Sequence, residues 1–137
     1  MADVLSIPER SLLMAKIKGK NTRPEIAVRS LLHKTGYRFR IHVSSLPGKP
    51  DIVLPRFRTV VFVHGCFWHR HSGCRATTTP KSHRRFWAEK FRRNVANDRK
   101  HLGQLRRLGW RVVVVWECQL KRPERVLGRI EKTLKKA

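Results

Sequence analysis

Cysteine and histidine side chains gather in one short part of the sequence. Cys66, His71 and Cys74 lie close together, and Cys118 is the remaining cysteine of the chain. Structural zinc sites take four such ligands in a tetrahedron, and three cysteines with one histidine form a common set. We therefore expect these four residues to hold a structural zinc ion, with Cys118 delivered by the end of a neighbouring strand.

The spacing leaves the histidine ligand open, because His64 and His69 lie beside the same loop and either could replace His71. The plain alternative is a set of three buried cysteines without metal, with His71 at the surface. A bound metal would explain how a loop with little regular apolar patterning keeps a fixed shape.

Acidic residues are scarce, with 9 Asp and Glu against 32 Lys and Arg, and Asp51 directly follows a Pro-Gly-Lys-Pro turn. A Pro-Asp pair at the start of a strand, followed by a second strand, is typical of the restriction-type nuclease core. Nucleases hold Mg²⁺ with one or two carboxylates and substrate oxygens. The alternative is that Asp51 only caps the turn by accepting backbone N–H groups.

The second strand carries Val61-Phe62-Val63-His64 where that nuclease core usually has an acidic residue and a lysine. A catalytic site here would then need a histidine as general base, because the ordinary pKa of imidazole suits it to activate water near neutral pH. His64 and His69 are the candidates for this base.

Two aromatic pairs, Phe67-Trp68 and Phe86-Trp87, lie among arginines. Large aromatic side chains beside cations are suited to stacking on bases or inserting between them. Any one of them could instead belong to the core. Consecutive side chains of an extended segment point to opposite sides, so we expect either Phe67 or Trp68 to face solvent.

The elements that must position these residues follow from periodicity and from capping residues. Thr22, Pro24 and Glu25 form a helix start, and Gly36 a stop. The expected helices are 11–17, 24–34, 86–108 and 123–136; the expected strands are 37–43, 51–54, 59–63 and 110–116, the last a central strand buried on both faces; the ligand-bearing loop is 64–80. The order α-β-β-β-α-β-α predicts an α/β fold, with a mixed central sheet between helices in three layers.

The chain has 137 residues, 40% of them hydrophobic, and a formal net charge of +23 at pH 7. This length and apolar content favour a single packed domain over residues 1–137, beginning with a basic arm at 1–20. A domain basic throughout repels itself unless a polyanion neutralises it, so nucleic acid is the leading partner, ahead of ribosomes or an anionic membrane surface.

Neither a secretory signal nor a membrane span is expected from the sequence. The longest apolar run, 112–116, is far shorter than the roughly 20 residues that cross a bilayer. Three cysteines cannot all pair within the chain, which favours a reducing cytoplasm over a disulfide-forming compartment.

Several long motifs, in one order, resemble the very short patch repair (Vsr) endonuclease family over most of the chain. These motifs are Ser45-Leu46-Pro47-Gly48-Lys49-Pro50-Asp51, His64-Gly65-Cys66-Phe67-Trp68-His69 with His71, Phe86-Trp87, Asn94 with Asn97-Asp98-Arg99, and Leu108-Gly109-Trp110-Arg111-Val112 through Cys118. The resemblance implies a restriction-endonuclease-like fold and a Mg²⁺-dependent nick of one DNA strand. The nick would fall 5′ to the thymine of a T·G mismatch, which arises when 5-methylcytosine deaminates.

The resemblance also implies the partners and the place of action. The substrate would be double-stranded DNA with a T·G mismatch, and mismatch-repair proteins and a repair polymerase would act with the enzyme. The enzyme would be a monomer in the bacterial cytoplasm, associated with the nucleoid when acting and not with a membrane.

Carried over to this sequence, the resemblance assigns roles to individual residues. It assigns catalytic roles to Asp51, His64 and Glu25 and makes His69 the general base, with Asp51 and the backbone carbonyl of Val63 as Mg²⁺ ligands. It assigns a structural zinc ion to Cys66, His71, Cys74 and Cys118. It places Met14 in the minor groove of the DNA and Phe67, Trp68 and Trp87 as a wedge in the major groove, and it gives Asn94 and Asp98 a supporting role. Position 63 is Val where a well-known member has Thr, which leaves a carbonyl ligand but no hydroxyl.

Two other classes of function fit the same residues. One is a nuclease of the same fold with another target, such as a restriction or junction-resolving enzyme. The other is a zinc-containing protein that binds nucleic acid by charge alone and cuts nothing.

Overall fold

The computed structural model describes residues 22–136, and its elements follow the order expected from the sequence. They are α2 (Arg23–Lys34), β1 (Arg40–Ile41), β2 (Ile52–Leu54), β3 (Thr59–His64), α3 (Arg84–Arg107), β4 (Arg111–Trp116) and α4 (Pro123–Leu134), with short 3-10 helices at Pro55–Phe57 and Glu117–Lys121. The helix expected at 11–17, the basic arm and Met14 lie outside the described residues.

The four strands form one mixed sheet in the order β1-β2-β3-β4. The pairs β1–β2 and β2–β3 are antiparallel, whereas β3 and β4 run parallel. Parallel neighbours need a long crossover, and the chain supplies it with the 24-residue helix α3 between β3 and β4.

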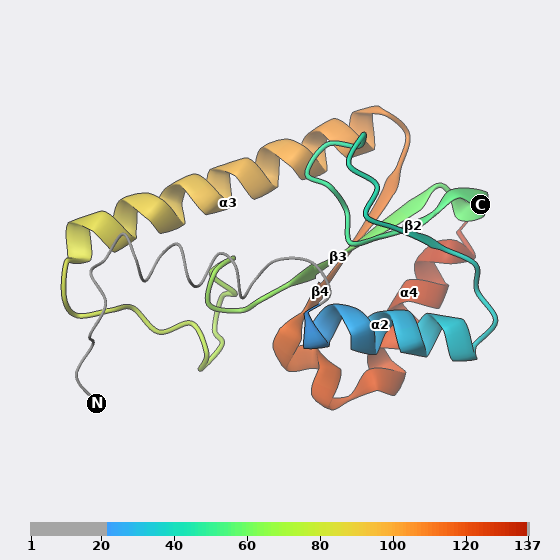
Figure 1. Cartoon of the computed structure of the whole chain (residues 1–137), viewed down its shortest axis with the longest axis horizontal. Helices are drawn as coiled ribbons and strands as arrows, with labels where there is room; N and C mark the ends of the chain where they lie inside the picture. The colour runs from blue at the N-terminus through green and yellow to red at the C-terminus, as the bar shows by residue number, and fades with distance from the viewer. Residues whose placement is uncertain (1–21, 137) are drawn as a thin grey trace.

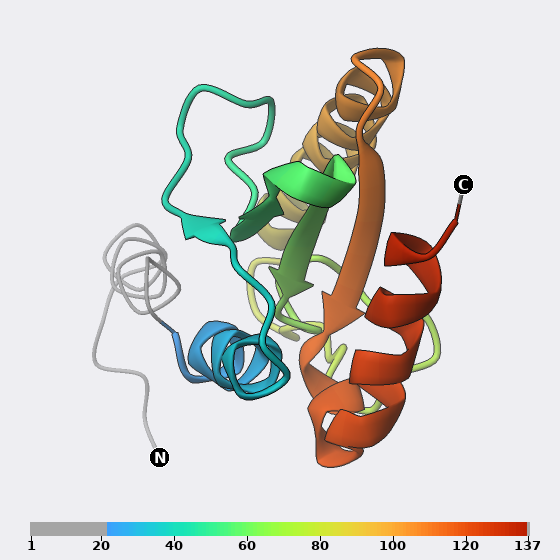
Figure 2. The same ribbon diagram turned by 90° about the vertical axis from the view of Figure 1, so that its right-hand side faces the viewer.

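Helices cover both faces of the sheet, which gives the three layers that the sequence predicts (Figures 1 and 2). On one face, α2 and α4 contribute Val28, Leu32, Val126 and Ile130 to a core that includes Val61 and Val115. On the other face, Leu102 and Leu105 of α3 pack against Val53, Val60 and Phe62. None of the described helices is both long enough and apolar enough to cross a membrane.

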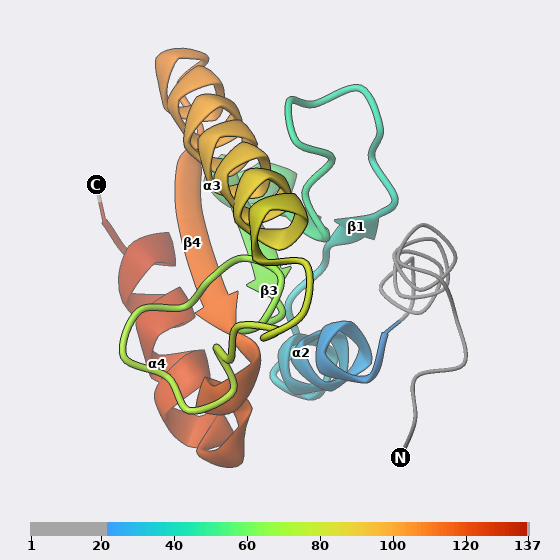
Figure 3. The same ribbon diagram turned by 90° about the vertical axis from the view of Figure 1, so that its left-hand side faces the viewer.

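Strand β3, like its neighbour β2, is buried on both faces. Its residues alternate between the two cores, with Val61 facing one and Val60 and Phe62 the other. In the parallel register His64 is the partner of Trp116, so the two strands end side by side. The loop that follows His64 and leads to α3 therefore lies at the same end of the sheet as the segment that follows Trp116 (Figure 3).

Two sequence-based expectations about the strands are wrong. The strand expected over 37–43 is reduced to Arg40–Ile41, because His42 adopts a left-handed backbone with a φ of 57° that ends the strand. Tyr37 instead packs edge-to-face on Phe57 and donates a hydrogen bond of 2.6 Å to Glu131 Oε2.

The strand expected to be central, β4, lies at an edge of the sheet that the described residues form. Its apolar run does face two cores, since Val113 and Val115 are buried beneath α4 and Val112 and Val114 pack on the α3 side. Arg129 of α4 donates to the Val114 carbonyl at 2.9 Å and so covers part of the open edge.

Candidate active site and metal centre

A cavity of about 640 Å³ opens where the first turn of α2, the turn before β2, the end of β3 and the middle of α3 converge. Four of the nine acidic residues in this basic chain line the cavity: Glu25, Asp51, Asp98 and Glu117. His64 and His69 line it as well, so the structure brings the predicted acidic and basic groups together in one place.

Asp51 directly precedes β2, and the backbone of the neighbouring strand β3 holds its side chain in place. Its Oδ2 accepts a hydrogen bond of 2.6 Å from the Val63 N–H. The pKa of the Asp51 carboxyl is raised to about 7, chiefly by burial and also by the adjacent Glu25, against the lowering effects of the Val63 N–H and of Arg29. Two carboxyl groups thus face each other out of water.

Glu25 is only 7% exposed and comes from the first turn of α2. The helix starts here because Thr22 Oγ1 accepts the Glu25 N–H at 3.5 Å, as the sequence predicts. Glu25 Oε2 forms an ion pair at 3.1 Å with the guanidinium of Arg29, which lies one turn further along the same helix. Two buried, facing carboxyl groups are a donor set that a divalent cation fits, since oxygen ligands are what Mg²⁺ prefers.

The two predicted histidines lie together, with the His64 and His69 rings stacked 3.8 Å apart and nearly parallel. His69 Nδ1 lies 2.6 Å from Asp98 Oδ2, so the neutral imidazole donates its Nδ1–H to this carboxylate. In that tautomer the other ring nitrogen, Nε2, is the one that can accept a hydrogen bond. The Trp116 ring packs edge-on against His64 at 5.2 Å and limits the movement of the stacked pair.

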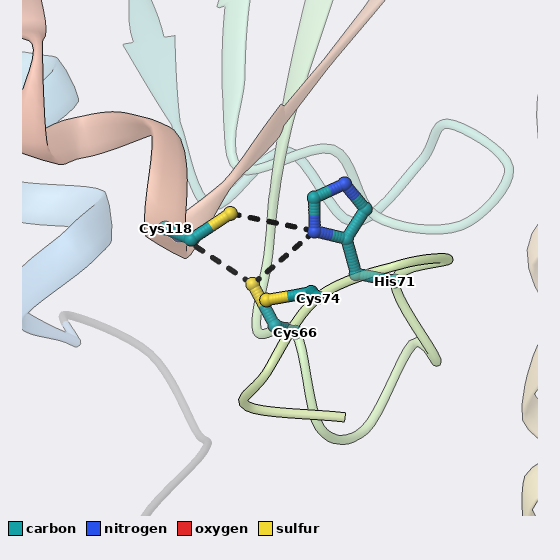
Figure 4. A group of neighbouring side chains, drawn as sticks. All are labelled: Cys66, His71, Cys74 and Cys118. Carbon is teal, nitrogen blue, oxygen red and sulfur yellow. Dashed lines mark hydrogen bonds between the residues drawn. The ribbon is translucent and has the colours of Figure 1, made fainter. Parts of the chain in front are cut away.

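The three cysteines and His71 form a separate cluster (Figure 4). His71 Nδ1 lies 3.6 Å from Cys66 Sγ and 3.4 Å from Cys118 Sγ, and one ligand atom of each of the four residues lies within 4.8 Å of the others. The cluster forms because Cys66 and Cys118 each follow the end of a paired strand by two residues.

The donor set of this cluster fits zinc. A sulfur ligand about 2.3 Å and a nitrogen ligand about 2.0 Å from a tetrahedral ion lie roughly 3.5 Å from each other, close to the 3.6 and 3.4 Å between His71 Nδ1 and the two sulfurs. Burial and the neighbouring thiols raise the pKa of Cys66 to about 12, whereas a backbone hydrogen bond from Ala76 lowers the pKa of Cys74. His64 and His69 lie with Asp98 in a second group, so the geometry brings His71, rather than either of them, to the cysteines.

The aromatic residues pack on one another beside the cavity. Trp68 lies 6.1 Å from Trp87 and 5.2 Å from Phe67, ring centre to ring centre. Phe67 and Trp68 are both half-buried, while Trp87 is only 3% exposed and Phe86 is 38% exposed. The expectation of one outward and one inward ring at Phe67 and Trp68 is therefore wrong, because the mutual packing shields both in part.

Supporting contacts tie this aromatic cluster to the long helix. Asn94 Nδ2 reaches the Trp68 carbonyl at 3.5 Å, and the Lys90 ammonium lies 5.4 Å from the centre of the Trp68 ring. The Arg70 guanidinium lies 4.0 Å from the Phe91 ring centre. One face of α3 thus holds the loop that carries the candidate wedge.

Several residues at or next to the cavity were not singled out from the sequence. Arg29 does not line the cavity but contacts Glu25, which does, and its place four residues after Glu25 on a helix is a signal that could have found it. Lys49 and His101 line the cavity. His101 follows Asp98 by one helical turn, whereas no spacing rule singles out Lys49.

Fold and site together define an α/β protein with a carboxylate–histidine cavity and a four-ligand metal-type cluster at the same end of its sheet. The family model described as DNA mismatch endonuclease Vsr matches residues 2–75. The chain is 44% identical to the DNA mismatch endonuclease Vsr of Escherichia coli, over 92% of this chain and 80% of that protein. The chain belongs to the Vsr family of DNA endonucleases.

Two further relatives are named as nicking enzymes. The chain is 52% identical to the type II nicking enzyme V.XorIIP of Xanthomonas oryzae pv. oryzae, over 98% of this chain and 96% of that protein. It is 46% identical to the type II nicking enzyme V.NmeAIP of Neisseria meningitidis, over 88% and 86% of the two chains.

Proposed function

We propose that this protein is a mismatch endonuclease that nicks one strand of duplex DNA 5′ to the thymine of a T·G pair, which starts short-patch repair. The observation that carries the proposal is the cavity in which Asp51, Glu25 and the His69–Asp98 pair meet. Membership of the Vsr family supports a DNA substrate, and the names of two relatives support a cut in a single strand.

The proposal includes a restriction-endonuclease-like core in a single domain over residues 1–137. The mixed sheet, with Asp51 at the start of β2 and His64 at the end of β3, supports this assignment. The enzyme would act as a monomer on DNA in the bacterial cytoplasm, and a repair polymerase and mismatch-repair proteins would follow it at the nick.

Mg²⁺ would be held by the Asp51 carboxylate and the Val63 carbonyl, with Glu25 supporting the bound water and the phosphate. When bound, the ion would stabilise negative charge on the phosphate and the leaving oxygen. The buried pair of carboxyl groups supports this ligand set, because a divalent cation removes their mutual repulsion. Val63 offers only its backbone, so the loss of a hydroxyl at this position leaves the proposed ligand in place.

His69 would be the general base. Asp98 accepts the Nδ1–H, which orients the ring and leaves Nε2 to take the proton from the attacking water. His64 would hold the His69 ring by stacking against it, and Trp116 would hold His64 in turn. A carboxylate behind an imidazole also stabilises the positive charge that the ring gains when it takes the proton.

Phe67, Trp68 and Trp87 would form the wedge beside the mismatch in the major groove, with Met14, which lies outside the described residues, on the minor-groove side. A mismatched step stacks poorly, so inserting rings there costs less than at a matched step. Trp87 is buried in the free protein, so its part would be to support the rings of Phe67 and Trp68. The net charge of +23 supports phosphate contacts around the wedge.

The cut position on a duplex with one T·G pair tests the proposal. The protein with Mg²⁺ is expected to give one nick, 5′ to the mismatched thymine, and no nick with Asp51→Ala at unchanged DNA affinity. Equal cutting of matched or branched duplexes would indicate a restriction-like or junction-resolving nuclease. DNA binding without any strand break would indicate a non-catalytic zinc-containing binding protein.

A further inference from the structure

When a phosphate enters the cavity, negative charge is in excess there, and none of the side chains assigned a role so far is a lysine or arginine that could offset it. Four carboxyl groups line the cavity, and a phosphodiester that enters brings another negative charge. Like charges a few ångströms apart in a partly dry cavity repel strongly. Strand β3, with the sequence Thr-Val-Val-Phe-Val-His, offers no lysine or arginine to offset that charge.

The cations available to a phosphate are few. Arg29 does not line the cavity, and its guanidinium is already committed to Glu25 at 3.1 Å. Among the described residues, the lysine and arginine side chains that line the cavity are Arg23 and Lys49. Lys49 is exposed and forms no ion pair with any carboxylate of residues 22–136, so its ammonium is available.

The backbone fixes Lys49 beside Asp51. The Lys49 N–H donates to the Leu46 carbonyl at 3.1 Å and closes the turn. Gly48 presses on α3 so closely that a Cβ there would lie 2.8 Å from His101 Cβ and 3.2 Å from the Phe62 ring. The buried Pro50 then joins Lys49 directly to the carboxylate residue. The turn is thus held on both sides, and Lys49 stays near the candidate metal ligand.

Lys49 adopts a left-handed backbone with a φ of 49°. Glycine takes this conformation without a steric penalty, whereas lysine does not. A strained residue at the edge of a site points to a use for its side chain, since glycine would serve the turn better. The side chain available here is a flexible ammonium two residues from Asp51.

Resting on the proposed endonuclease activity, we propose that Lys49 is a catalytic residue whose ammonium binds a non-bridging oxygen of the scissile phosphate. Water adds to phosphorus, its proton passes to His69 Nε2, and the bond from phosphorus to the 3′ oxygen of the preceding nucleotide breaks. That leaving oxygen takes a proton from solvent. Lys49 keeps its proton throughout and offsets the charge that grows on the phosphate oxygens.

The experiment measures single-turnover nicking of a duplex with one T·G pair, by the full-length protein at saturating concentration with Mg²⁺. Lys49→Gly is expected to nick about 100-fold more slowly, with an unchanged or raised melting temperature because the strained backbone is relieved. Lys49→Met tests the same loss without the change at the backbone. Lys49→Arg should recover most of the rate, and Lys34→Ala, which removes an exposed cation at the C-terminal end of α2 that does not line the cavity, should match the wild type.

Three outcomes would overturn the proposal. One is a Lys49→Gly rate within twofold of the wild type. Another is a Lys49→Gly rate that returns to the wild-type value when the protein concentration is raised, since Lys49 would then contribute only to binding the DNA backbone. The third is a lowered nicking rate for Arg23→Ala together with a normal rate for Lys49→Met, which would indicate that Arg23 binds the scissile phosphate instead. A wild-type protein that does not nick would instead refute the proposed function itself.

Discussion

At the scale of single residues, the contact between His69 Nδ1 and Asp98 Oδ2 determines which ring nitrogen can take a proton. We predict that Asp98→Asn lowers the single-turnover nicking rate by about 100-fold, because an amide can bind the ring in the wrong tautomer. The melting temperature should change little, since Asp98 is partly exposed on α3. The measurement is nicking under saturating protein beside a thermal melt.

A matched control lies on the same helix. Lys100→Ala changes an exposed residue of α3 that does not line the cavity, and it should leave the nicking rate unchanged. A normal rate for Asp98→Asn would show that His69 does not depend on this carboxylate for its orientation.

Tyr37 shows a second residue-scale effect, on stability. Its hydroxyl donates to Glu131, and this hydrogen bond, followed by burial and the charge of Glu131, raises the pKa of Tyr37 above its ordinary value. We predict that Tyr37→Phe lowers the free energy of unfolding by about 1 kcal/mol at neutral pH. The contribution is complete below the unfolded-state pKa of about 10 and is lost as pH rises through the raised folded-state value.

Denaturant titrations of the wild type and Tyr37→Phe at several pH values measure this difference. The two free energies of unfolding should converge only in strongly alkaline solution. A difference that shrinks as the pH falls from about 9 to about 6, where Glu131 stays ionised, would contradict the assignment, because the folded state would then not favour the protonated hydroxyl.

Residue types alone predicted much of the site. Scarcity drew attention to Asp51 and to the cysteines, since few other carboxylates or thiols compete for a role in this sequence. Lys49 was missed for the opposite reason, because one lysine among 32 basic residues carries no signal until the turn around it is seen. Spacing left the zinc histidine open, whereas the parallel ends of β3 and β4 bring His71 to the cysteines.

At the scale of elements, the turn before β2 is shaped by its contact with α3. We predict that Gly48→Ala destabilises the protein by about 2 kcal/mol, because its Cβ would meet His101 and because a φ of 73° disfavours alanine. The displaced turn should also slow nicking, since it carries Lys49 and leads into Asp51. Thermal denaturation and single-turnover nicking of the same samples measure both effects.

Gly103→Ala on α3 is the matched control, because a Cβ there meets nothing within 4 Å. Replacing a glycine inside a helix should raise stability by roughly 0.5–1 kcal/mol, with normal nicking. Equal stabilisation by Gly48→Ala would mean that the turn does not press on α3.

The elements also show where sequence patterns fail. Capping and periodicity located α2 and β3 well, because both signals are local to the segments that form them. The alternating residues of 37–43 satisfied the pattern of a strand, yet tertiary contacts of Tyr37 and the left-handed His42 limited β1 to two residues. An apolar run could not reveal that β4 is an edge strand, since helices bury it on both faces all the same.

At the scale of the whole molecule, basic and acidic side chains are distributed differently. The net charge of +23 favours a polyanionic partner, whereas four of the nine carboxyl groups line one cavity, so the proposed DNA-binding surface extends beyond the proposed catalytic cavity. The loop between β3 and α3 joins the two, since it carries His69, the half-buried rings and three residues of the cysteine cluster.

This cluster should therefore stabilise the fold and the site together. We predict that Cys118→Ser lowers the zinc content from one ion per chain towards zero, because a four-ligand site loses its only ligand from outside the loop. At zinc concentrations near a thousand times the dissociation constant, the lost binding corresponds to about 4 kcal/mol of stability. Metal analysis and thermal melts measure the two losses, and chelation should bring the wild type down to the same melting temperature. Ser72→Ala, an exposed position in the same loop, should keep both the zinc and the stability. A full zinc complement in Cys118→Ser would assign the fourth ligand elsewhere and leave the loop without its link to β4.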